Sequence, residues 1–104
     1  MALIKREVTE GIQDQSSSEE VVYSITTTNW GSDPTDVSVV AYEEGNPTAV
    51  TATVFPVNSP VIADDVITLS PLKALTVGKT YRIEVKFTIS LSVLECYFRV
   101  QCRS

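Results

Sequence analysis

Histidine is absent from this sequence of 104 residues, and tryptophan, methionine, cysteine and glycine are scarce. The lack of histidine removes the most common general base, the histidine of Ser and Cys catalytic triads and the most common metal ligand. No catalytic or cofactor-binding motif is present among the remaining residues. We therefore expect a protein that is not an enzyme, with no catalytic residues, metal site or cofactor.

Long apolar runs are also missing. No stretch reaches the ~20 apolar residues that span a bilayer, and the opening MALIKREVTE places charges where a signal peptide needs its apolar segment. The net charge of −5 disfavours nucleic acid as a partner, because phosphate neutralisation needs clustered Lys and Arg. We expect no membrane segment, no secretion signal and no nucleic-acid partner.

The charges that are present are unevenly distributed. Residues 1–65 hold eleven acids and two bases, a net charge of −9, whereas residues 66–104 hold two acids and six bases, a net charge of +4. Such asymmetry indicates a surface for association.

The two cysteines, Cys96 and Cys102, lie six residues apart in one expected strand. At ~3.3 Å per residue they are separated by roughly 20 Å on one face, too far for a disulfide. We expect two free thiols that face the core, as in a reducing compartment.

Alternation of apolar and polar residues dominates the chain, and TYRIEVKFTI and LECYFRVQC show it best. These two segments predict a hairpin with Leu91 and Ser92 as its loop. In that register Ile89 faces Leu94 inside, and Glu84 faces Arg99 outside, so both faces match.

Further strands are expected in EVVYSITT, DVSVVAYEE, AVTATVF and DVITL, with LIKREVT as a charged edge strand. All five prolines fall between these segments. The polar run QDQSSSEE predicts a mobile loop near residues 13–20.

This pattern predicts one domain, residues 1–104, with an all-β fold: an immunoglobulin/fibronectin III-like β-sandwich of about seven antiparallel strands. Within LTVGKTYRIEV, Leu75, Gly78, Thr80 and Tyr81 resemble the corner of such domains, where the tyrosine hydroxyl bonds to upstream backbone.

Acidic pairs are the remaining candidates for chemistry. Neighbours in a strand point to opposite faces, so we interpret these pairs as solvated turn charges. The alternative is calcium binding by Asp33 and Asp36, or by Asp64 and Asp65, although no loop supplies the six to eight oxygens that calcium takes.

Two aromatic residues are candidate contacts. Trp30, in TTTNWGSDPTDV, is either a lid over one end of the sandwich or an anchor at an interface. Tyr97 either packs on the stem of Lys86 or binds a partner.

The outer face of the final hairpin forms a candidate interaction surface. It carries Arg82, Lys86 and Arg99, with Arg103 nearby, on an otherwise acidic body. This face either docks to an acidic protein surface, including another copy of the chain, or is an ordinary solvated face.

The phrases IKREVTE, YSITTTNWGSDPTDVSVV, DVITLSPLKALTVGKTYRIEVKF and ECYFRV together resemble short immunoglobulin-like proteins encoded in bacteriophage and prophage structural gene clusters. The resemblance implies a virion structural or decoration protein, made in the cytoplasm of the bacterial host, that binds other virion proteins or assembles as a homo-oligomer. It assigns no functional residues. The alternative is a carbohydrate-binding or adhesive module, for which Trp30 with Asn29 and Asp33 is the candidate group.

Overall fold

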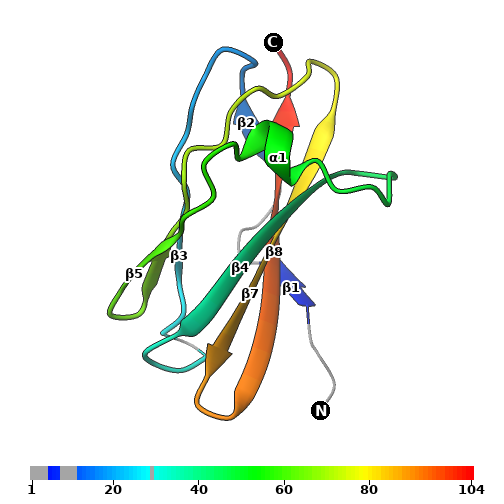
Figure 1. The fold of residues 1–104 in the computed structure, drawn as a ribbon. Coiled ribbons are helices and arrows are strands. Elements are labelled where there is room, and N and C mark those ends of the chain that lie inside the picture. Colours follow the sequence, from blue (N-terminus) through cyan, green and yellow to red (C-terminus); the bar gives the residue numbers. More distant parts are fainter. Residues whose placement is uncertain (1–4, 8–11, 29) are drawn as a thin grey trace.

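The computed structural model describes residues 5–7, 12–28 and 30–104 and consists mostly of β-strands arranged in two sheets (Figure 1). The strands are β1 (Lys5–Glu7), β2 (Gln13–Gln15), β3 (Ser24–Thr26), β4 (Thr35–Glu43), β5 (Val61–Ala63), β6 (Val66–Thr68), β7 (Thr80–Ile89) and β8 (Ser92–Cys102), and the one helix in this described part is α1 (Thr51–Val54). The predicted all-β fold is therefore confirmed at the level of two sheets around a shared core.

The larger sheet has the order β1-β8-β7-β4, with β2 also paired to β8, and the smaller has the order β3-β6-β5. The expectation that all strands are antiparallel is wrong for β1 and β2, which run parallel to β8. Both are distant from β8 in the sequence, so no tight turn forces an antiparallel pair.

The β7–β8 hairpin forms as expected, but its register differs from the prediction by two residues. The loop is Ser90–Leu91, and Ile89 faces Ser92 rather than Leu94. Ser90 has a φ of 57°, which the first central residue of a type I′ or II′ hairpin turn requires. A shift of two residues keeps every side chain on its expected face, since the strand period is two.

The strand expected in AVTATVF is wrong, because Thr51–Val54 form the single helical turn of α1. The turn is closed by the Phe55 N–H, which donates to the Thr51 carbonyl at 2.7 Å. The turn leaves Val54 and Phe55 only 1% and 2% exposed. Burial of these two neighbouring apolar side chains stabilises the turn, so the segment does not need the alternating pattern of a strand.

The polar loop expected near residues 13–20 is wrong at its start, where β2 forms. Gln15 is buried, and its Nε2 donates to the carbonyls of Leu72 at 2.6 Å and Glu19 at 3.1 Å. Its Oε1 accepts a hydrogen bond from the Tyr23 hydroxyl at 3.0 Å. A polar side chain with its hydrogen bonds satisfied can thus close one end of the core.

The core lies between the two sheets, and it contains both cysteines as free, buried thiols, as expected. The corner before β7 is also confirmed: the Thr76 N–H donates to the Tyr81 hydroxyl at 2.8 Å. Gly78 in this corner has a φ of 88°, a conformation that costs glycine little.

Candidate interaction surfaces

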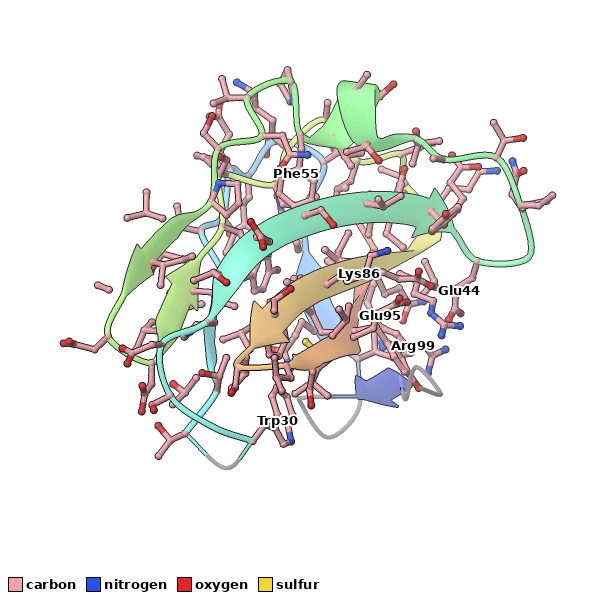
Figure 2. All side chains as sticks on the ribbon, turned by 60° about the horizontal axis from the view of Figure 1, so that its bottom comes forward. Trp30, Glu44, Phe55, Lys86, Glu95 and Arg99 are labelled. Atoms are coloured by element: carbon pink, nitrogen blue, oxygen red, sulfur yellow. The ribbon has the colours of Figure 1, made fainter. Side chains whose placement is uncertain are left out.

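Four of the five predicted contact residues come together on the outer face of the larger sheet. Arg82 and Lys86 project from β7, and Tyr97 and Arg99 project from β8, at alternate positions of a paired hairpin. Figure 2 shows Lys86 and Arg99 on this hairpin, with Trp30 apart from them at one end of the molecule. We call these four residues the hairpin face.

Arg82 and Tyr97 form the aromatic centre of the hairpin face. The guanidinium carbon of Arg82 lies 4.2 Å from the centre of the Tyr97 ring, and Arg82 Nε lies 3.1 Å from a carboxylate oxygen of Glu84. The observed register places Lys86 opposite Glu95 and Tyr97 opposite Glu84, so Lys86 is a diagonal neighbour of Tyr97 and not the directly opposite residue that the predicted register gives.

Arg99 pairs with an acid far away in the sequence. Its Nε and Nη2 donate to the two carboxylate oxygens of Glu44 at 2.7 and 2.9 Å. The prediction that Arg99 faces Glu84 across the hairpin is wrong, because Arg99 lies opposite Arg82. The nearby Arg103 approaches Asp14 to 2.9 Å. The acidic first part of the chain therefore neutralises much of the positive charge near the last strand.

Lys86 differs from the arginines of the hairpin face. Its side chain is exposed, and no carboxylate among the described residues forms an ion pair with it. It is therefore the cation of this face whose charge is available to a partner.

A hollow of about 570 Å³ adjoins the hairpin face where β4 ends. It is lined by Tyr42, Glu43, Glu44, Gly45, Asn46, Pro47, Arg82 and Glu84. A smaller hollow of about 210 Å³ shares Tyr42 and Glu84 with it and reaches Lys86. The lining combines the aromatic ring of Tyr42 with polar and charged side chains, which suits binding of a polar, extended ligand. It contains no nucleophile with a neighbouring base. No residue pattern in the sequence predicts this hollow, and the turn signal EEGNP after β4 is the one local hint.

Trp30 lies at the end of the sandwich, half-buried against the core. Its ring stacks on Phe87 with 5.8 Å between ring centres and 24° between ring planes. Of its proposed sugar-binding neighbours, Asn29 lies outside the described residues, and Asp33 is exposed with a φ of 57°. This geometry favours the packing interpretation of Trp30.

Within the described ranges, no three His, Cys, Asp or Glu side chains gather as a metal site would require. The pairs Asp33–Asp36 and Asp64–Asp65 therefore do not extend to a larger ligand group there. The helix content of the same residues includes no helix long and apolar enough to cross a membrane.

The hydroxyl of Tyr23 has a perturbed environment. Burial raises the pKa of the Tyr23 hydroxyl, and the negative charge of Glu19 raises it further. Tyr23 also packs on Phe98, with ring centres 4.9 Å apart. The group lies beside Gln15 in the closed end of the core, so its perturbation reflects packing.

Comparison with protein-family models, with curated proteins and with solved structures finds no match to this chain. Any function must therefore be argued from the residues and surfaces described above.

Proposed function

We propose that this chain is a non-enzymatic virion structural or decoration protein of a bacteriophage or prophage, acting through protein–protein contacts. The resemblance of its phrases to immunoglobulin-like proteins of phage structural gene clusters motivates the virion assignment. The contact role draws on the composition of the hairpin face, because arginine and tyrosine are enriched at protein interfaces.

We further propose that the sandwich is immunoglobulin-like in its finer topology. The order β3-β6-β5 against β4-β7-β8 matches the B-E-D and C-F-G sheets of that fold, and Tyr81 stands near the start of the strand that carries its tyrosine corner. The first strands differ from those of constant-type immunoglobulin domains, where the first strand pairs with the strand that corresponds to β3. Here β1 and β2 pair with β8 instead.

The observation that carries the contact proposal is Lys86, an exposed cation on the same face of the hairpin as Arg82 and Tyr97. Arg82 and Arg99 have carboxylate partners within the chain, so reversing them also disturbs the fold. Lys86→Gln removes the available charge with less risk to folding. Lys73→Gln is its matched control, because Lys73 pairs with Glu20 at 3.7 Å in another part of the molecule.

Mass spectrometry of purified virions, or of particles induced from a lysogen that carries this gene, tests the proposal. We expect the chain in the particles, with weaker incorporation of the Lys86→Gln chain, most clearly at low salt, and normal incorporation of the Lys73→Gln chain. Particles that lack the wild-type chain refute the virion role. Incorporation that is indifferent to salt and to Lys86 refutes docking through the hairpin face.

A carbohydrate-binding role is a second candidate, favoured by Tyr42 and Asn46 in the larger hollow. Hexasaccharides of glucose and of N-acetylglucosamine, titrated into the labelled protein and followed by NMR, test this role. Binding shifts the resonances of residues 42–47 and is lost in Tyr42→Ala. Unchanged spectra at saturating sugar exclude these sugar classes.

A further inference from the structure

β5 forms an open edge of the smaller sheet. It pairs with β6 on one side and is the last strand in the order β3-β6-β5, as Figure 1 shows at the left of the molecule. Across the described residues, nothing hydrogen-bonds to the other side of β5. Val61 is 63% exposed and Ile62 39% exposed, so this edge presents unpaired backbone groups beside apolar side chains.

The corresponding edge of the larger sheet is covered. The Val50 N–H donates to the Ala41 carbonyl at 2.8 Å, and the Ala41 N–H donates to the Thr51 hydroxyl at 3.0 Å. The Asn58 side chain donates to the Val39 carbonyl at 3.1 Å. The chain thus protects β4 from pairing with further strands and leaves β5 without such protection.

The outer surface next to β5 carries no charge. Ser24, Thr68 and Val61 form one row across the three strands, and Thr26, Val66 and Ala63 form the next. Such a row of small β-forming side chains suits contact with a flat, extended segment.

The segment of the chain that forms this edge carries charges of one sign. Residues 7–72, which include the whole smaller sheet, contain eleven acids and no Lys or Arg. Asp64 and Asp65 form the turn that ends β5, and Asp64 is exposed. A strand that pairs with β5 therefore contacts apolar side chains along β5 and negative charge at the end of β5.

We propose that β5 pairs with an extended segment of a partner protein that carries Lys or Arg at the end lying next to Asp64 and Asp65. Backbone hydrogen bonds to β5 provide the attachment, and the basic end provides charge complementarity. This inference deepens the proposed function, because it names the class of partner for a protein that acts through protein contacts.

A second copy of this chain is the less suitable occupant of the edge. Pairing β5 with β5 brings together two surfaces that carry acids and no base, within chains of net charge −5 each. Like charges at an interface oppose association, most strongly at low salt.

The test uses peptides immobilised on a surface and the intact, folded protein. The first peptide alternates threonine and valine and ends in two lysines; the second ends in two glutamates; the third is the lysine peptide with proline at its central valine. We expect the lysine peptide to bind about two- to fivefold more tightly than the glutamate peptide, with the difference shrinking as salt rises. The proline peptide loses a backbone donor and binds weakly.

Two variants place the binding on the edge. Val61→Lys adds a charge to β5 and abolishes binding, whereas Val22→Lys adds the same charge just before β3, the strand at the other edge of the smaller sheet, at a residue 53% exposed, and retains binding. Asp64→Asn removes one of the two negative charges at the end of β5 and reduces the preference for lysine; asparagine tolerates the positive φ of 53° at this position. Equal thermal unfolding midpoints of the three variants and wild type confirm that each is folded.

Several results would overturn the inference. Absence of binding to the lysine peptide, equal binding of both charged peptides, or unchanged binding by Val61→Lys contradicts it directly. A concentration-dependent dimer in sedimentation that Val61→Lys abolishes identifies a second copy as the occupant instead. A chain that binds the lysine peptide and is missing from virions refutes the virion role and leaves the edge inference standing.

Discussion

Arg99 and Glu44 join β8 to the loop after β4 through two parallel hydrogen bonds, of 2.7 and 2.9 Å (Figure 2). The two residues are 55 positions apart in the sequence. This paired geometry fixes the loop that walls the larger hollow, because the planar guanidinium fits a carboxylate in one orientation.

The ion pair predicts a measurable coupling. Both side chains are about one-third exposed, so a double-mutant cycle with Glu44→Gln and Arg99→Gln should give about 0.5–1 kcal/mol, decreasing as salt rises. Denaturant unfolding of the four proteins measures it. A coupling of zero at low salt would show that the pair adds nothing to stability.

Trp30→Ala is expected to destabilise the fold. The ring stacks on Phe87 and is half-buried, so its loss should lower the free energy of unfolding by about 2–4 kcal/mol. Leu91→Ala, at a residue 97% exposed, is the control and should change it by less than about 0.5 kcal/mol. Unchanged stability of Trp30→Ala, with loss of a partner, would favour the interface interpretation.

Gly31 is expected to be intolerant of a side chain. A Cβ at this position would lie 2.6 Å from Cγ2 of Ile89, at a φ of 147°. Gly45 also has positive φ, of 83°, but faces open space, so it separates backbone strain from steric clash. Gly31→Ala should therefore lower the thermal midpoint clearly more than Gly45→Ala. Equal effects of the two substitutions would mean that Ile89 gives way without cost.

Gln15 is expected to stabilise the closed end of the core. Gln15→Leu leaves the Tyr23 hydroxyl without its acceptor and removes a donor from the Leu72 carbonyl, at a cost of about 1–3 kcal/mol. The half-buried Gln13 of the same strand provides the control, Gln13→Leu, with a smaller loss. Stability that rises in Gln15→Leu would show that apolar burial outweighs these hydrogen bonds.

The raised pKa of Tyr23 predicts that the stability of the fold decreases in alkali. Burial, with the charge of Glu19, raises the pKa of Tyr23 in the fold above the ordinary tyrosine value of 10.0. The folded state therefore retains the proton longer than the unfolded state, and the free energy of unfolding falls as pH rises above the unfolded pKa. Tyr23→Phe removes this part of the decrease, as unfolding between neutral pH and about pH 11 would measure. Parallel curves for the two proteins would contradict the shift.

The sequence predicts strands best where side chains alternate over many residues, as in β4, β7 and β8. Alternation fixes which face of the sheet a residue occupies. A shift of the strand pairing by two residues keeps every residue on the same face, so alternation does not determine the register. The hairpin register was therefore open, and with it the partners of Tyr97 and Arg99. Neither candidate loop contains the Asn-Gly pair that would have placed the turn.

The missed elements are short and lack such alternation. α1 occupies an apolar run with β-branched residues, where four residues carry too little periodicity to distinguish helix from strand. β2 lies in a polar segment, because its buried residue is Gln15 and not an apolar one. β5 has three residues between Pro60 and Asp64, and no strand was expected there. The Arg99–Glu44 pair depends on tertiary structure and leaves no local pattern.

The position of β8 in the larger sheet determines when the protein can fold. β8 pairs with β7 on one side and with β1 and β2 on the other, yet the ribosome makes it after all of these. Until β8 emerges, β1 and β2 have no strand to pair with, and β7 lacks its partner on one side. The larger sheet therefore assembles late in synthesis, and a chain interrupted before β8 is expected to aggregate rather than form a smaller domain.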